Sequence, residues 1–157
     1  MTWEERKAAG DAHEQRVAHE LELRGWTVSQ CGTGVYKPEI QWALGRSESS
    51  IREFPDLIAA RDGEVVTIDC KERMSSAETG RYAISRRCLT AGMKFLGANA
   101  PVPLYYVFGN LGVLTPAEVM HYGSLGQRGG SYYLVPGRLG HHFDDVFGTP
   151  VARGQAA

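Results

Sequence analysis

Asp56, Asp69 and Lys71, near the middle of the chain, have the types and the spacing to bind a hard divalent cation. Between them lies Asp62-Gly63, flanked by apolar runs, and this dipeptide is typical of a hairpin turn, because a type I′ turn needs positive φ at both central residues. Counting back from the turn puts Asp56 directly across from Asp69, with Cβ atoms about 4.5–5.5 Å apart. Lys71 shares that face, because side chains alternate along a strand. Opposed carboxylates repel each other, so the pattern predicts Mg²⁺, or Mn²⁺ in its place.

A third carboxylate, that of Glu14, lies on the apolar stripe of a helix predicted over residues 3–24. Val17, Ala18 and Leu21 share this stripe at helical spacing. An unpaired charge is costly to bury, so the position of Glu14 is explained if it reaches the cation or the Lys71 ammonium. Three other glutamates could be the third acid instead, and all lie in the segment 31–54: Glu39, Glu48 and Glu53.

The remaining pattern predicts the elements that would position these side chains. Strands are expected at 26–30, 56–61, 64–69, 103–108 and 131–135, and helices at 3–24, 85–98 and from 115 onward. Residues 31–54 have no clear period, so we expect a long loop with at most one helical turn. Both faces of the hairpin are apolar, so we expect a sheet that is covered on both sides. The two faces carry Leu57, Ala59, Val66 and Ile68, and Ile58, Ala60 and Val65.

The bulk properties set limits on the class of protein. The 157 residues suit one domain, expected over 1–148, with a disordered tail at 149–157. The cysteines (Cys31, Cys70 and Cys88) form no C-x-x-C pair, which argues against a disulfide framework or a zinc knuckle and fits a reducing cytoplasm. No apolar run approaches the roughly 20 residues of a membrane helix, so no membrane contact is expected. The net charge of −1 means that any binding to nucleic acid must rest on local basic patches.

Glu14, Pro55-Asp56 and Asp69-Cys70-Lys71 together resemble the PD-(D/E)XK, or restriction-endonuclease-like, nuclease superfamily. The order helix-strand-strand-strand-helix-strand agrees with it, over roughly residues 10–110. The short chain and the helix-borne glutamate look most like Holliday junction resolvases and small phage or plasmid nucleases. The resemblance implies an α/β fold with a central mixed β-sheet flanked by helices.

The resemblance also implies an activity, that of a metal-dependent DNA endonuclease that hydrolyses phosphodiester bonds. Asp56 and Asp69 would hold the metal together with the backbone carbonyl of Cys70, Lys71 would orient or activate the attacking water, and Glu14 would be the third acid. No small-molecule cofactor is implied. This chemistry needs a Lewis acid on the phosphate, a water of lowered pKa and positive charge near the phosphorane, and the residue types supply them.

The partners follow from the same hypothesis. We expect basic side chains to contact DNA phosphates: Arg73, Arg81, Arg86, Arg87 and Lys94. We also expect a homodimer, because two sites related by a two-fold axis are the simplest way to cut two strands. The alternatives are a nuclease-fold module that binds nucleic acid without cutting it and a restriction-type site-specific endonuclease. A small-molecule hydrolase or methyltransferase is less favoured, because the sequence has no Gly-rich phosphate loop and no nucleophile elbow.

Overall fold

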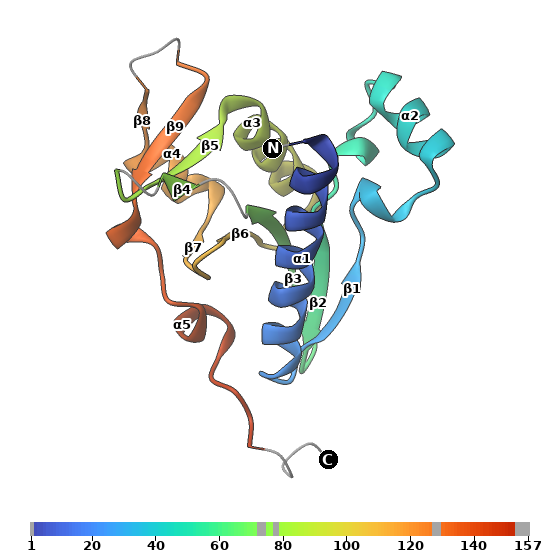
Figure 1. Cartoon of the computed structure of the whole chain (residues 1–157). Helices are drawn as coiled ribbons and strands as arrows, with labels where there is room; N and C mark the ends of the chain where they lie inside the picture. Colours follow the sequence, from blue (N-terminus) through green and yellow to red (C-terminus); the bar gives the residue numbers. More distant parts are fainter. Residues whose placement is uncertain (1, 72–74, 77–78, 127–129, 153–157) are drawn as a thin grey trace.

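The computed structural model of the protein describes residues 2–71, 75–76, 79–126 and 130–152. Helices and two sheets are arranged as in Figure 1. The helices are α1 (Trp3–Glu22), α2 (Pro38–Arg46), α3 (Arg86–Asn99), α4 (Pro116–Tyr122) and α5 (Phe143–Phe147), with 3-10 turns η1 (Thr33–Val35), η2 (Ser50–Glu53) and η3 (Gly137–Leu139). The strands are β1 (Thr27–Gln30), β2 (Leu57–Arg61), β3 (Glu64–Lys71), β4 (Ser75–Ser76), β5 (Arg81–Ser85), β6 (Leu104–Phe108), β7 (Val113–Leu114), β8 (Ser124–Leu125) and β9 (Tyr132–Pro136).

The first sheet is mixed and has the order β1-β2-β3-β6-β7. Its strands β3 and β6 run parallel, whereas the other neighbours run antiparallel. Between β3 and β6 the chain forms β4, β5 and then α3, so α3 belongs to the crossover that a parallel pair requires. The second sheet, β4-β5-β9-β8, is antiparallel. The predicted order of elements and the central mixed sheet are confirmed, and the second sheet is an addition.

The β2–β3 hairpin has the predicted register. Leu57 pairs with Ile68 and Arg61 pairs with Glu64, so that only Asp62 and Gly63 remain in the turn. Both turn residues have positive φ, 51° and 80°, as a type I′ turn requires. The pairing therefore directs the next two residues out, Asp56 and Asp69, toward each other at the open end of the hairpin.

Helix α1 covers one face of the first sheet. Its stripe of Val17 and Leu21 is fully buried and packs with Leu57, Ile68 and other residues of β2 and β3. Side chains of α5 complete this core, with Phe147 completely buried. The buried stripe confirms that α1 is the core helix that the sequence predicts, and it fixes Glu14 one turn before Val17.

The opposite face of the hairpin is open, so the prediction of a sheet covered on both sides is wrong there. Ile58 is 39% exposed and Val65 is 37% exposed, and Ala60 is exposed as well. The reason is the position of α3, whose buried residues pack with Leu104 and Tyr106 of β6 in the second core cluster. Helix α3 therefore covers β6 and the inner part of β3 and leaves the outer part of the hairpin uncovered.

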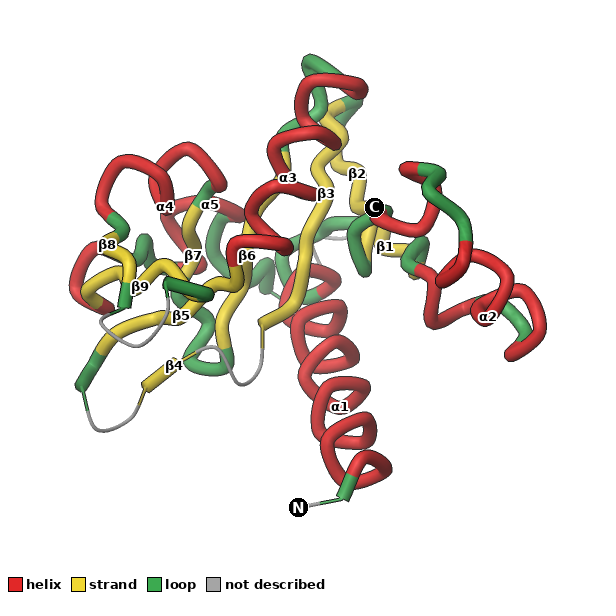
Figure 2. The backbone as a smooth tube through the Cα atoms, turned by 90° about the horizontal axis from the view of Figure 1, so that it is seen from above, coloured by secondary structure: helices red, strands yellow, loops and turns green. Residues whose placement is uncertain are grey.

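The segment between β1 and β2 is largely helical, so the prediction of a long loop there is wrong. We call residues 33–54, which comprise η1, α2 and η2, the arm. Pro38 starts α2 at a position where proline favours a helix, and none of the residues of α2 is buried. The helix spans nine residues, and its apolar stripe consists of Ile40, Ala43 and Leu44 alone, which is too short a repeat to predict a helix. In Figures 1 and 2 the arm extends on the β1 side of the sheet, away from the second sheet.

The end of the described chain returns to α1. The Val151 amide donates to the Leu23 carbonyl at 2.9 Å, and the Arg24 guanidinium donates a hydrogen bond to the Gly148 carbonyl. The tail predicted to be disordered begins at residue 149, so its first described residues contact the end of the first helix. Among the residues that the structure describes, no helix has the length and apolar character needed to cross a membrane.

Candidate active site

Asp56, Asp69 and Lys71 meet at the open end of the β2–β3 hairpin, as the register requires. The Asp56 carboxylate accepts a hydrogen bond of 2.7 Å from the Cys70 amide, which ties the residue before β2 to β3. The Lys71 ammonium forms an ion pair of 2.5 Å with Oδ1 of Asp69 and lies 5.7 Å from the centre of the Tyr106 ring. The predicted grouping of these three side chains is therefore present.

The two carboxyl groups lie close together, and this shifts the pKa values of Asp56 and Lys71. Burial raises the pKa of Asp56 to about 8, and the charge of Asp69, whose carboxyl group also hydrogen-bonds to that of Asp56, adds to the effect. Burial alone would lower the pKa of Lys71, but the Asp69 carboxylate outweighs it, and the pKa of Lys71 is raised. Lys71 is therefore a charged ammonium at neutral pH, while the Asp56 carboxyl keeps its proton to an unusually high pH.

Glu14 lies on the α1 side of the same end of the sheet. Its Oε1 accepts a hydrogen bond of 2.9 Å from Gln30, the last residue of β1. Burial raises the pKa of Glu14, and the charges of Asp11 and Asp69 contribute to the rise. Glu14 and Asp56 also line one cavity of about 210 Å³. The third predicted acid is thus close enough to sense the charge of Asp69, and Gln30 is the residue that holds it.

The other glutamates proposed as third acid have different positions. Glu39 and Glu48 are exposed on the arm. Glu53 is half-buried, lies 4.0 Å from the Arg52 guanidinium and lines a cavity with Cys88. Glu14 is the glutamate whose pKa is raised by Asp69, so the arrangement favours Glu14 over the alternatives.

Cysteine side chains surround the acids, and sequence reasoning missed the importance of Cys88. Its thiol is 3.6 Å from Oδ2 of Asp69, so Asp69 is held by Lys71 on one oxygen and by Cys88 on the other. The Cys70 side chain is partly buried and packs against the core on the α1 side. Burial and the charge of Asp56 raise the pKa of Cys31 to about 11. The contact of Cys88 joins β3 to the first turn of α3, which no local pattern encodes.

The residues at the hairpin end fit a hard divalent cation. The charge of Asp69 raises the pKa of Asp56, and a cation placed between the two carboxyl groups would relieve this repulsion. Within the described ranges, no three side chains of the His, Cys, Asp or Glu types are gathered so that they could hold a metal ion together. A cation would therefore bind to Asp56 and Asp69 and complete its shell with a backbone carbonyl or water, since Mg²⁺ usually keeps several waters.

The predicted DNA-contacting residues fall into two places. Arg86, Arg87 and Lys94 are exposed on α3, and Arg87 lines the same cavity as Cys88, next to the acids. Arg81 is half-buried at the far end of β5, four residues before Ser85 and hence roughly 13 Å away along the strand. Arg73 lies outside the described residues. The structure groups the α3 residues and separates Arg81 from them.

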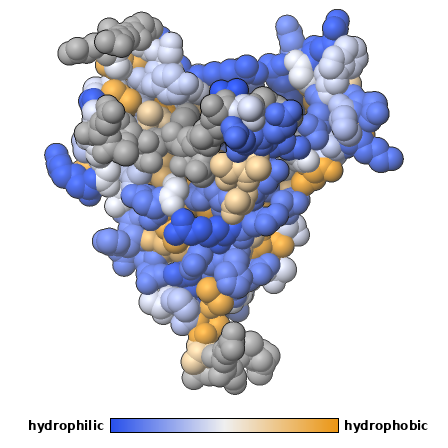
Figure 3. Space-filling model, viewed as in Figure 1, coloured by the Kyte–Doolittle hydropathy of each residue, from blue (hydrophilic) through white to orange (hydrophobic). Residues whose placement is uncertain are grey.

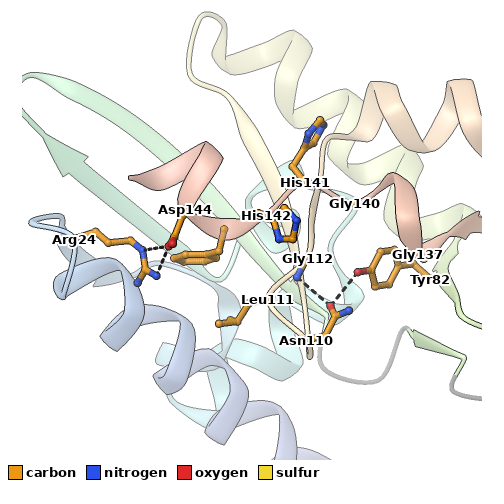
Figure 4. A pocket seen from close by; sticks show the side chains of 11 residues that line it. Arg24, Tyr82, Asn110, Leu111, Gly112, Gly137, Gly140, His141, His142 and Asp144 are labelled. Atoms are coloured by element: carbon orange, nitrogen blue, oxygen red, sulfur yellow. Dashed lines mark hydrogen bonds and ion pairs between the residues drawn. The ribbon is translucent and has the colours of Figure 1, made fainter. Parts of the chain in front are cut away.

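A cavity of about 390 Å³ lies away from the acids, between α1, the β6–β7 turn and the segment before α5 (Figure 4). Its polar side chains already bind one another. Arg24 pairs with Asp144 at 2.6 Å, and the Asn110 side chain accepts hydrogen bonds from the Tyr82 hydroxyl and the Gly112 amide. These groups hold the two sheets and the C-terminal segment together, so this cavity is a packing seam and not the candidate active site.

Two solved structures share the fold of this chain. The structure of Hjc, a Holliday junction resolvase from the archaeal hyperthermophile Archaeoglobus fulgidus, matches 91% of this chain and 98% of its own, with a TM-score of 0.54 and 13% identity. A nuclease from a fusselovirus matches 88% of this chain and 89% of its own, with a TM-score of 0.51 and 14% identity. This chain has the restriction-endonuclease-like fold. The fold expected from the sequence resemblance is thereby confirmed. No protein-family model and no curated protein sequence matches the chain.

Proposed function

We propose that the protein is a Mg²⁺-dependent DNA endonuclease that hydrolyses phosphodiester bonds and selects its substrate by DNA structure, in the manner of a junction resolvase. The observation that carries the proposal is the meeting of Asp56, Asp69 and Lys71 at the open end of one hairpin. The fold, shared with a junction resolvase and a viral nuclease, supports it.

Asp56 and Asp69 are the proposed metal ligands, together with the backbone carbonyl of Cys70, and Glu14 is the proposed third acid. All of these are hard oxygen donors, which favour Mg²⁺ and accept Mn²⁺ as a substitute. When bound, the cation supplies Lewis acidity to the scissile phosphate and lowers the pKa of a bound water. Gln30 would keep the Glu14 carboxylate facing the site.

Lys71 supplies positive charge that does not depend on the cation. Its ammonium stays protonated at neutral pH because the Asp69 carboxylate raises its pKa. A protonated lysine donates hydrogen bonds and accepts none, so its role is to orient the attacking water and to stabilise the charge that develops on the phosphorane. The contact with Asp69 at 2.5 Å fixes the ammonium beside the metal ligands.

DNA is the proposed partner, held next to the acids by Arg86 and Arg87 at the start of α3, with Lys94 farther along the helix. A homodimer is proposed as well. The exposed apolar face of the hairpin, with Ile58 and Val65, is a surface that a second copy would cover. Two copies related by a two-fold axis would carry one active site for each strand.

The second candidate is a nuclease-fold module that binds DNA without cutting it. The complete set of Asp56, Asp69 and Lys71 argues against it, because a module without catalysis is expected to lack one of them. A panel of labelled DNA substrates (four-way junction, flap, duplex and single strand) with Mg²⁺ or EDTA separates the two. Cleavage that needs Mg²⁺ and is fastest on one branched substrate supports the proposal. Binding without cleavage of any substrate supports the module.

A further inference from the structure

The arm exposes large apolar and aromatic side chains that the fold does not use. Trp42 is 67% exposed, Ile40 is 46% exposed and Tyr36 is 36% exposed, while α2 has no buried residue at all. The Arg46 guanidinium lies 4.9 Å from the centre of the Trp42 ring, one helical turn away. Figure 3 shows the arm projecting from the body at the upper right, where α2 lies in Figure 1. An exposed tryptophan stacked with an arginine is a surface for planar ligands.

A groove connects the arm to the candidate active site. It has a volume of about 330 Å³ and lies between the arm and the first turns of α3. Arg52 and Glu53 line it on the arm side, and Arg87 and Cys88 on the α3 side. Since the Cys88 thiol lies 3.6 Å from Oδ2 of Asp69, the groove ends one side chain away from the acids. A strand whose phosphate lies at Asp69 can therefore extend along the groove toward the arm.

The charges of the groove fit a nucleic-acid strand. Arg52 and Arg87 oppose the single carboxylate of Glu53, which lies 4.0 Å from Arg52. The Nε of Arg52 is buried and has no hydrogen-bond acceptor among the described residues. The Arg52 side chain as a whole is 27% exposed, so the exposed part of its guanidinium, and not the buried Nε, is available to a phosphate, and arginine side chains also stack on bases.

We propose that the arm binds unpaired bases of the DNA strand that enters the active site, with Trp42 and Arg46 as the stacking surface. This inference rests on the proposed nuclease function and names the substrate class of that site. In a duplex each base is stacked between its neighbours, so a base has a free face only where the strand is unpaired. The arm then favours DNA with unpaired bases, such as a flap or a bubble, over a continuous duplex.

A second copy of the chain suits this surface less well. A stable interface buries about 800 Å² on each partner and is depleted of charge at its centre. On the arm, Lys37, Glu39 and Arg46 lie among the apolar residues of one short helix. The open hairpin face offers the exposed apolar side chains of Ile58 and Val65 and is the better dimer surface.

The test measures the affinity of Trp42→Ala for a duplex and for the same duplex with a central unpaired bubble, by fluorescence anisotropy in EDTA. Stacking on one aromatic side chain implies that the variant binds the bubble about 5- to 150-fold more weakly, with duplex binding changed less than about twofold. Trp42→Phe should recover most of the bubble affinity. Tyr122→Ala, which removes an exposed aromatic ring on α4, is the matched control and should change neither affinity.

Other outcomes would contradict either the inference about the arm or the proposed function. Equal weakening on both substrates, or no weakening on either, overturns the inference while the proposed function stands. A Trp42→Ala protein that is monomeric where the wild type is dimeric, with unchanged bubble affinity per site, assigns the arm to a second copy and overturns the inference. Wild-type protein that binds neither DNA and cuts neither in Mg²⁺ overturns the proposed function, and the inference with it.

Discussion

Replacing Asp56 by Asn should stabilise the protein in EDTA above neutral pH. The folded state raises the pKa of Asp56 from 3.8 to about 8, through burial and through the charge of Asp69. Between these two values the folded state binds more protons than the unfolded state, so the free energy of unfolding falls as the pH rises. Asparagine carries no charge at any of these pH values, and its side-chain oxygen can still accept the hydrogen bond from the Cys70 amide.

The magnitude follows from the shift. One pKa unit corresponds to about 1.36 kcal/mol, so about four units set a ceiling of about 5 kcal/mol. The hydrogen bond from the Cys70 amide is weaker to a neutral side chain, which lowers the expected gain in the free energy of unfolding by about 1 kcal/mol. In the wild type the Lys71 ammonium can move toward an ionised Asp56, which lowers the gain further. We therefore expect Asp56→Asn to gain about 1–3 kcal/mol at pH 8.5 in EDTA. For a chain of this size the melting temperature should rise by about 2–4 °C per kcal/mol.

The assay is a set of thermal melts of both proteins at pH 5 and pH 8.5, with EDTA or Mg²⁺. At pH 5 only about 1.2 of the roughly four pKa units have come into effect, so the stabilisation of the variant should be less than half of its value at pH 8.5. Mg²⁺ at 100 times its dissociation constant should stabilise the wild type by about 2.7 kcal/mol and the variant very little. Asp145→Asn, at an exposed carboxylate on α5, is the control and should change the free energy of unfolding by less than about 0.5 kcal/mol. If Asp56→Asn melts below the wild type at pH 8.5 in EDTA, Asp56 supports the fold and the reasoning is refuted.

Three further predictions concern rate, binding and assembly. Glu14→Gln should lower the single-turnover cleavage rate in Mg²⁺ about 10- to 100-fold, because it removes the negative charge that Gln30 holds at the site. An unchanged rate would mean that another residue is the third acid. The double variant Arg86→Ala, Arg87→Ala should reduce the slope of log affinity against log salt by about 0.9 for each DNA phosphate that the variant no longer binds, and an unaltered slope would exclude that face of α3. Ile58→Glu should be a monomer in analytical sedimentation, because a charged side chain opposes burial of the open hairpin face against a second copy. A variant that still dimerises would show that the dimer interface lies elsewhere.

The sequence predicts the site better than its surroundings, for physical reasons. A two-residue turn fixes every pairing in a hairpin, so Asp62-Gly63 alone determines that Asp56 faces Asp69. The crossover from β3 to α3 brings the thiol of Cys88 to Asp69, and no periodic pattern in the sequence predicts such a contact.

The helix of the arm and the open face of the hairpin could not be predicted from the sequence, for related reasons. No side chain of α2 is buried, and its apolar stripe of Ile40, Ala43 and Leu44 is short, so Pro38 at the first helical position was the clearest local indication of this helix. The run of apolar residues in β2 and β3 is typical of a strand buried on both faces, yet Ile58 and Val65 are exposed. Burial there depends on where α3 crosses the sheet, which the local sequence does not specify.

The most direct measurement is the conversion of supercoiled plasmid to nicked and linear forms by the wild type, Asp69→Asn and Lys71→Met in Mg²⁺. The wild type should cut only with Mg²⁺ or Mn²⁺, Asp69→Asn should show no cleavage, and Lys71→Met should be slower by about 100-fold or more, the usual cost of removing one group that stabilises the transition state. All three proteins should remain folded and bind DNA in EDTA. Cleavage by Asp69→Asn or Lys71→Met at the wild-type rate, or cleavage by the wild type in EDTA, would contradict a metal-dependent nuclease site at the end of this hairpin.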